Sequence, residues 1–216
     1  MLKSLATLMV VLIALTAQAN SARGGPPDPA NSECPAECIK VVGHDGVLGD
    51  AIGKYCVTIR DFNNVPVPNA TVTVEFSNCG DIQLCADQKD PDVIVDCVAQ
   101  TVRKLTDVDG RACFRVIGRR RNVDCAPKPN PCVEVFWDGT FICALYAPVF
   151  DLVNEPGVGV SGNDLSEFLH LFFDCGVYLT AIDYNCNATV DGDDLSEFLR
   201  AFFGGGSALG CDSKCP

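Results

Sequence analysis

Residues 161–173 read SGNDLSEFLHLFF and residues 191–203 read DGDDLSEFLRAFF, a near-identical repeat with a period of 30 residues. In each copy the apolar residues recur three and four positions apart, which is the spacing of one face of an α-helix. These residues are Leu165, Phe168, Leu169 and Phe172 in the first copy and Leu195, Phe198, Leu199 and Phe202 in the second. Neither helix can bury its apolar stripe alone, so we expect the two helices to pack stripe to stripe. A unit this small usually needs a metal ion or disulfide bonds to stay folded.

A loop rich in oxygen-bearing side chains, DYNCNATVDGDD at residues 183–194, precedes the second predicted helix. Oxygen side chains occupy loop positions one, three, five, nine and twelve, and a backbone carbonyl is available at position seven. This is the ligand spacing of an EF-hand calcium loop. The predicted calcium ligands are Asp183, Asn185, Asn187, the backbone carbonyl of Thr189, Asp191 and Asp194. Position six, where the turn requires a positive φ and favours glycine, is Ala188, and we expect a cost in stability there.

The loop in front of the first helix is less regular. Counting back twelve positions from Asp164 reaches Val153 rather than an acidic residue. Asp151 and Asn154 can therefore act as ligands only if this loop carries two extra residues. We expect one good calcium site in the second loop and one weak or absent site in the first, where the candidate ligands are Asp151, Asn154, Ser161 and Asp164.

A metal-free interpretation exists as well. Asp164 to Glu167 and Asp194 to Glu197 match the Asp-x-x-Glu pattern of helix capping, which needs no cation. Capping alone does not explain the oxygen-bearing side chains at the start of the second loop, in residues 183–187. The sequence therefore favours calcium in the second loop over a metal-free helical hairpin.

An aspartate-closed loop that runs directly into a leucine-containing helix, twice over, resembles the dockerin domains of cellulosomal and related secreted proteins. The resemblance covers about residues 150–203, and its motif is most specific in the second repeat. It implies the calcium ligands given above and a cohesin-like protein domain as the partner. Dockerins set partner choice largely by the residues before the closing aspartate, which here are Gly162-Asn163 and Gly192-Asp193 instead of the common hydroxyl pair. An extracellular matrix, or the chain's own β-domain, stays open as an alternative docking surface.

The chain before the repeats alternates apolar and polar residues, as half-buried β-strands do. The alternation is clear at residues 55–59 and 71–76, and the prolines and asparagines at residues 63–69 favour a turn between them. Asp109-Gly110 and Asp138-Gly139 predict further turns between neighbouring strands. Short strands separated by turn signals, without a long helical pattern, indicate an antiparallel β-sandwich.

Two motifs in this region have less specific interpretations. Residues 107–110, DVDG, look like the start of a calcium loop, but a strand pattern follows them, so we expect a β-hairpin turn. Arg119, Arg120 and Arg121 lie near a proline-rich stretch, and we expect a solvated loop rather than a partner-binding patch.

Residues 57–61 (VTIRD), 66–74 (PVPNATVTV) and 106–114 (TDVDGRACF) resemble bacterial Ig-like domains of the invasin and intimin type, from which the cysteine density departs. The expected fold is mainly β with a small α module, in which an antiparallel Ig-like β-sandwich precedes a two-repeat loop–helix module of the dockerin type. The predicted layout is a signal peptide at 1–19, a linker at 20–33, a disulfide-rich sandwich at 34–149, the calcium-loop repeats at 150–204 and a tail with a cysteine pair at 205–216.

The first 19 residues have the order of a secretory signal peptide: a positive charge at Lys3, an apolar run at 5–15, and Ala17-Gln18-Ala19. That run is shorter than the roughly 20 residues that span a bilayer, so we expect cleavage near Ala19 and no membrane insertion. The protein is then secreted, or displayed at the cell surface.

All 14 cysteines follow the predicted cleavage site, which fits disulfide bonds formed in an oxidising compartment. Zinc is the alternative, but the closest pairs, such as Cys34 and Cys38, lack the CxxC spacing of most zinc sites. A bond between Cys175 and Cys186 would tie the first helix to the second loop.

Charge and missing motifs narrow the function. The net charge is −12, and residues 151–216 hold eleven Asp or Glu residues against Arg200 and Lys214, a net charge of −9. Such a segment disfavours nucleic acid and anionic membranes and suits a divalent cation. The chain has two histidines and neither a GxSxG nor an HExxH motif. We expect a secreted, non-catalytic calcium-binding protein that attaches to a partner or matrix; the alternative is an accessory protein or enzyme of extracellular polysaccharide degradation.

Overall fold

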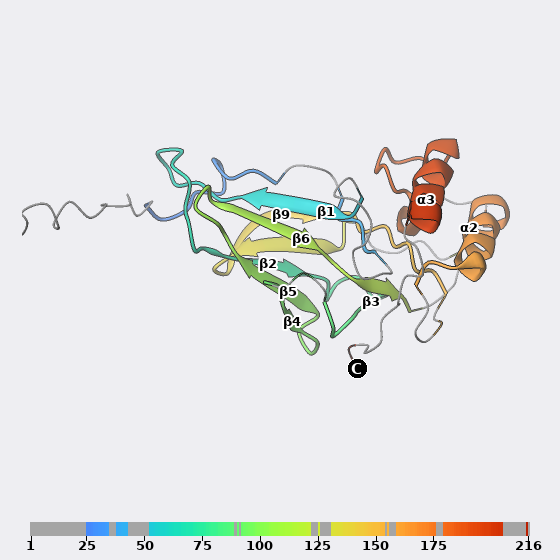
Figure 1. Ribbon diagram of the computed structural model, residues 1–216. Coiled ribbons are helices and arrows are strands. Elements are labelled where there is room, and N and C mark those ends of the chain that lie inside the picture. The colour runs from blue at the N-terminus through green and yellow to red at the C-terminus, as the bar shows by residue number, and fades with distance from the viewer. Residues whose placement is uncertain are drawn as a thin grey trace, which may run out of the picture.

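The computed structural model describes residues 25–34, 38–42, 52–88, 90, 92–121, 125, 131–153, 155, 159–175, 179–204 and 215. Over these residues the chain is mainly β, with antiparallel sheets followed by a small helical part at one end of the β-domain (Figure 1). The prediction of a mainly β fold with a small α part is confirmed. The predicted signal peptide lies outside the described residues. Within them, no helix is both long enough and apolar enough to cross a membrane.

The largest sheet has five antiparallel strands. In spatial order these are β4 (Ile94–Asp96), β5 (Thr101–Leu105), β2 (Thr71–Glu75), β8 (Val133–Trp137) and β9 (Thr140–Leu145). The predicted alternation decides which face is buried: Val72 and Val74 are fully buried, while Thr71 and Thr73, which alternate with them, are half-buried. The predicted turn at Asp138-Gly139 joins β8 to β9, and both residues have a positive φ, 40° and 83°, as a tight hairpin turn requires.

Two smaller sheets complete the β-domain. One pairs β1 (Lys54–Thr58) with β6 (Arg111–Arg115), and the other pairs β3 (Ile82–Leu84) with β7 (Gly118–Arg120). Inward-facing side chains from all three sheets form one buried cluster, to which Val57, Leu84 and Val135 contribute. This packing of sheets on a common core fits the predicted β-sandwich.

The turn at Asp109-Gly110 is present, but the hairpin expected there is wrong. The turn links β5 to β6, but these strands belong to different sheets and do not pair with each other. The turn packs on the chain that leaves β1, where the Ile59 N–H donates to the Gly110 carbonyl at 2.7 Å. Gly110 has φ +72°, and a Cβ on it would lie 2.5 Å from the Ile59 carbonyl oxygen, so only glycine fits.

The expectation of a solvated arginine loop is wrong for two of its three residues. Arg119 and Arg120 lie in strand β7 and are only 2 % and 1 % exposed, whereas Arg121 is exposed. Their charges act on acidic groups of the C-terminal part of the chain, Arg119 on Asp151 and Arg120 on Glu167. A charged residue can be buried when opposite charges are close, and here those charges come from much later in the sequence.

The expected linker, residues 20–33, is fixed to the β-domain over its described part. The backbone N–H of Asp28 donates to the Arg60 carbonyl, and that of Glu33 donates to the Thr58 carbonyl, each at 2.8 Å. The segment therefore runs beside the end of β1 as an added piece of sheet.

Asp61 fastens the same region. Its buried carboxylate accepts backbone hydrogen bonds from Val65 at 2.9 Å, Gly25 at 2.7 Å and Asn63 at 2.9 Å. These bonds, led by the one from Val65, lower the pKa of Asp61 against the opposing effect of burial.

Helices form at the repeated segments, as predicted. They are α2 (Gly162–Asp174) and α3 (Gly192–Gly204), with a short 3₁₀ turn, η1 (Thr180–Ile182), between them. The apolar stripes meet at Phe168 and Phe198, which are fully buried and stacked with ring centroids 5.1 Å apart. Helix α2 begins with a capping box, in which Ser161 caps Asn163 and Asp164 accepts the Ser161 N–H.

The helices share a buried cluster with the β-domain. Val42 and Ile117 of the β-domain pack in this cluster with Phe150 and Tyr184 of the C-terminal part. The rings of Phe150 and Tyr184 stack with centroids 4.3 Å apart, and the Tyr184 hydroxyl donates to the Val149 carbonyl at 2.9 Å. The helical part is therefore packed onto the β-domain and is not a loosely tethered appendage.

Disulfide bonds are confirmed throughout the described chain. The pairs are Cys34–Cys143, Cys38–Cys186, Cys56–Cys113, Cys79–Cys132, Cys97–Cys215 and Cys125–Cys175, and Cys85 is also disulfide-bonded. The sequence left the pairing open, and the bond considered between Cys175 and Cys186 does not form, because each of these cysteines joins the helical part to an earlier segment. With no free thiol among the described cysteines, none of them is available as a zinc ligand.

Candidate calcium loops

Asp183 opens the second loop and is 1 % exposed. Its Oδ1 accepts the Asn187 N–H at 3.2 Å, and its Oδ2 accepts the Ala188 N–H at 3.0 Å. Ala188 has φ +65°, so it adopts the left-handed conformation for which the sequence pattern expects glycine. The carboxylate of the first loop position therefore holds the tight turn at positions five and six.

Asp194 closes the loop and is fully buried. Its Oδ1 accepts the N–H groups of Tyr184 at 2.7 Å and Asn185 at 3.2 Å, and its Oδ2 accepts the Asp191 N–H at 2.9 Å. One carboxylate thus ties the beginning of the loop to its end, directly before helix α3.

Short-range hydrogen bonds order the remaining oxygen side chains. Asn185 Oδ1 accepts the Asn187 N–H at 3.0 Å, and Asn187 Oδ1 accepts the Thr189 N–H at 2.8 Å. Asp191 Oδ1 accepts the Asp193 N–H at 2.8 Å. All six predicted residues of the second loop therefore lie in one connected network, which Thr189 joins through its N–H and its hydroxyl.

The first loop closes in the same way. Asp164 is fully buried, its Oδ1 accepts the N–H groups of Leu152 and Val153, and its Oδ2 accepts the Ser161 N–H, each at 2.7 Å. Leu152 and Val153 follow Asp151 as Tyr184 and Asn185 follow Asp183. Asp151 therefore occupies the opening position, and the loop from Asp151 to Asp164 is two residues longer than its counterpart. The other predicted residue of this loop, Asn154, lies outside the described residues.

Sequence reasoning missed Glu155 in this loop. Its Oε2 accepts the Ser161 hydroxyl at 2.8 Å, and its Oε1 accepts the Asn163 side-chain amide. Glu155 also acts electrostatically on Asp151. The available signal was that Glu155 is the only acidic residue between the two aspartates that bound the loop.

The carboxylates of the first loop are poorly compensated. Asp151 is 1 % exposed, and its Oδ1 has no hydrogen-bond partner among the described residues. Burial, followed by the neighbouring charge of Asp164, raises the pKa of Asp151 to about 8, although Arg119 acts in the opposite direction. Burial also raises the pKa of Asp164, against its hydrogen bonds from the loop backbone.

Buried carboxylates also repel one another in the second loop. Burial raises the pKa of Asp194, and the nearby charge of Asp183 adds to that rise. Tyr184, the second residue of this loop, is affected by both loops: burial raises its pKa, and the charges of Asp164 and Asp194 both raise it further. Closely spaced buried carboxylates repel one another, and a bound cation would reverse that penalty.

The donor set fits calcium better than other metals. Carboxylate, amide and carbonyl oxygens are ligands of hard cations, and a loop of this length can supply the six or more that calcium takes. Among the described residues, no three His, Cys, Asp or Glu side chains converge closely enough to form a metal cluster by themselves. Three of the six expected ligands in the second loop are instead asparagine side chains and a backbone carbonyl.

Comparison with known proteins identifies no relative. No protein-family model matches the sequence, and neither a curated protein nor a solved structure matches it significantly. The function of the chain is therefore inferred from its own residues.

Proposed function

We propose that this chain is an exported, non-catalytic calcium-binding protein, in which a dockerin-like loop–helix module at residues 150–204 attaches an Ig-like β-sandwich to a protein partner or an extracellular matrix. The observation that carries the proposal is the matched closure of two loops. In each loop one buried aspartate accepts three backbone hydrogen bonds from corresponding positions. Duplicated closure around buried carboxylates supports a tandem pair of calcium loops.

Calcium in the second loop would be held by Asp183, Asn185, Asn187, the Thr189 carbonyl, Asp191 and Asp194. Its main energetic role is to compensate the buried charges of Asp183 and Asp194, which repel one another. The first loop would use Asp151, Asn154, Glu155, Ser161 and Asp164. We assign it the weaker affinity, because its two extra residues must be ordered around the ion.

The exposed sides of the two helices are the attachment surface in this proposal. Their burial patterns agree position by position from 161 to 173 and from 191 to 203. Each side carries an exposed serine, Ser166 or Ser196, and ends in a strongly exposed phenylalanine, Phe173 at 72 % or Phe203 at 76 %. Aromatic side chains are enriched in protein interfaces, so this side suits a protein partner such as a cohesin-like domain.

A second candidate is that the calcium is purely structural and the module is a cap on its own β-domain. The observation that favours it is the junction, where Cys38–Cys186 and Cys125–Cys175 join the two parts. An ion pair of 3.1 Å between Lys40 and Glu197 also crosses the junction. In this case calcium governs stability, and no partner is needed.

Calcium binding is tested by calorimetric titration of the full, chelator-treated chain, since the helices share a core with the β-domain. The Asp183→Ala/Asp194→Ala double variant removes both buried carboxylates of the second loop. Asp109→Ala, in an exposed turn, is the matched control. The proposal predicts saturable binding that the control retains and the double variant loses at one site. A wild-type chain that binds no calcium contradicts it.

Attachment is tested by retention of the exported protein on the surface or matrix fraction of the producing cells. Wild-type protein should be retained in calcium and released by EGTA. A Phe173→Ser/Phe203→Ser variant should bind calcium normally but lose retention. If this variant is retained as well as the wild type, attachment through the helices is contradicted, and the structural cap is the better account.

A further inference from the structure

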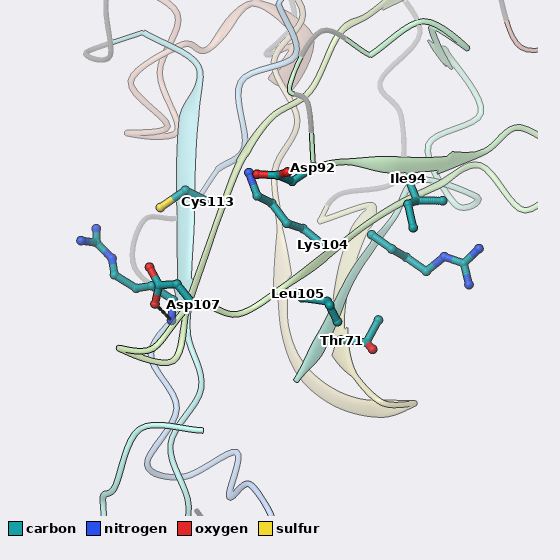
Figure 2. Close-up of a pocket in the computed structure, with 9 residues that line it drawn as sticks. Thr71, Asp92, Ile94, Lys104, Leu105, Asp107 and Cys113 are labelled. Atoms are coloured by element: carbon teal, nitrogen blue, oxygen red, sulfur yellow. Dashed lines mark hydrogen bonds between the residues drawn. The ribbon is translucent and has the colours of Figure 1, made fainter. Parts of the chain in front are cut away.

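A cleft of about 810 Å³ lies in the β-domain, between β6 and the edge of the five-stranded sheet formed by β4 and β5 (Figure 2). Asp92, just before β4, and Ile94, the first residue of β4, line it together with Arg103, Lys104 and Leu105 of β5 and Arg111 of β6. In Figure 1, β4 and β5 lie away from α2 and α3, so the cleft is separate from the calcium loops. Its volume is in the range of ligand-binding pockets.

Two charged groups of the cleft are already engaged and shape its wall. Lys104 Nζ lies 2.8 Å from Asp90 Oδ1, and both side chains are less than one-fifth exposed, at 17 % and 16 %. Asp107 Oδ1 accepts the backbone N–H groups of Asp109 at 2.9 Å and Arg111 at 3.0 Å, which braces the turn before β6. Figure 2 shows the Lys104 side chain extending toward Asp92 across the cleft.

The two arginines of the cleft are available for a ligand. Arg103 and Arg111 are both exposed, and neither guanidinium makes an ion pair or hydrogen bond within the described part of the chain. Each can bind a carboxylate through two parallel N–H···O bonds. Asp92 and Asp107 also line the cleft, so Arg103, Lys104 and Arg111 leave its lining with an excess of one positive charge, in a chain of net charge −12.

Apolar side chains lie beside these arginines. Ile94 is 64 % exposed and sits directly opposite Arg103 in the β4–β5 ladder, so the two share one face of the sheet. Leu105, 56 % exposed, lies two residues beyond Arg103 on the same face. Arg103 and Leu105 are thus a cationic and an apolar contact two residues apart on β5, and Ile94 adds an apolar contact on the neighbouring end strand, β4.

We propose that this cleft binds an acidic peptide segment of a partner protein, with carboxylates at Arg103 and Arg111 and apolar side chains on Ile94 and Leu105. An extended peptide presents side chains of both kinds alternately, and can also form backbone hydrogen bonds with β4, the end strand of this sheet among the described residues. A small inorganic anion would leave the apolar wall uncovered. An acidic polysaccharide would satisfy the arginines but not Ile94 and Leu105.

The test is fluorescence anisotropy with a short labelled peptide of alternating glutamate and leucine, titrated with the full chain at low salt. Arg103→Gln/Arg111→Gln should weaken binding at least about tenfold, since it removes both guanidinium groups that pair with the peptide carboxylates. The matched control, Arg121→Gln, changes an exposed arginine outside the cleft and should leave binding unchanged.

Three kinds of result overturn the proposal. One is that the wild-type chain does not bind the peptide, or that the double variant binds it as tightly as the wild type does. Another is that a peptide with glutamine in place of glutamate, or serine in place of leucine, binds equally well. The third is that polygalacturonate displaces the peptide as effectively as unlabelled peptide does, which would identify the ligand class as an acidic polysaccharide. Thermal unfolding of each variant confirms that these surface changes leave the fold intact.

Discussion

Replacing Ala188 with glycine should stabilise the protein, although glycine is the more flexible residue. Ala188 has φ +65°, and Asp183 Oδ2 holds its N–H at 3.0 Å, so the loop fixes the left-handed conformation. An L-residue in that conformation costs about 1–2 kcal/mol. Glycine loses more conformational freedom on folding than alanine does, and this reduces the stabilisation by about 0.5–1 kcal/mol. Ala188 is exposed, so its methyl group contributes little buried area, and the net gain in the free energy of unfolding is about 0.5–1 kcal/mol.

The expected change is measurable as a melting temperature. For a chain of this length, 1 kcal/mol corresponds to about 2–4 °C, so Ala188→Gly should raise Tm by about 1–4 °C in calorimetry in the presence of EGTA. Ala201→Gly is the matched control: this residue is buried within helix α3, where glycine costs about 1 kcal/mol relative to alanine. A Tm for Ala188→Gly that falls as far as that of Ala201→Gly would refute the assigned loop conformation.

Three further predictions follow from the packing. Asp61, whose pKa is lowered in the fold, contributes stability that is present above the ordinary aspartate pKa and is lost as pH falls through the lower, folded value. Asp61→Asn should therefore flatten the loss of stability in acid, and an unchanged acid-unfolding curve would contradict this. Cys38→Ser/Cys186→Ser should weaken calcium binding about tenfold in calorimetry, because Cys186 lies inside the second loop; equal affinity would show that the bond does not order the loop. Phe198→Ala, at a fully buried ring, should cost about 3–5 kcal/mol in denaturant unfolding. Phe203→Ala, at a ring 76 % exposed, should change the free energy of unfolding by less than about 0.5 kcal/mol. Similar losses for the two variants would show that the buried and exposed faces of the helix are assigned incorrectly.

The sequence predicted those elements whose signals are local. The helices were predictable because an apolar stripe at Phe168 recurs at Phe198 in an otherwise repeated segment. The turn at Asp138-Gly139 was predictable because its residue types suit a positive φ at both positions. Position six of the second loop was predictable from the loop spacing and not from its residue type, and Ala188 adopts the positive φ expected there.

Features that depend on distant partners were not predictable. The buried guanidinium of Arg119 donates to Gln83 Oε1 at 3.0 and 3.2 Å and acts on the charge of Asp151, and no local pattern connects either residue to it. Disulfide pairing was hidden for the same reason, since the bond to Cys186 comes from Cys38, 148 residues earlier. From the sequence alone, charged residues are expected to be exposed and cysteines close in sequence are expected to pair. In the fold, contacts between distant segments decide both the burial of the charges and the pairing of the cysteines.

Thermal unfolding of the full chain in calcium and in EGTA tests the central claim most directly. At a free calcium concentration of 100 times Kd, binding to the native state alone adds about 2.7 kcal/mol. At about 2–4 °C for each kcal/mol, the proposed loops predict a Tm higher by roughly 5–11 °C in calcium for the wild-type chain. Asp183→Ala/Asp194→Ala should lose most of that difference. Identical melting temperatures of the wild-type chain in calcium and in EGTA would contradict a calcium-binding function.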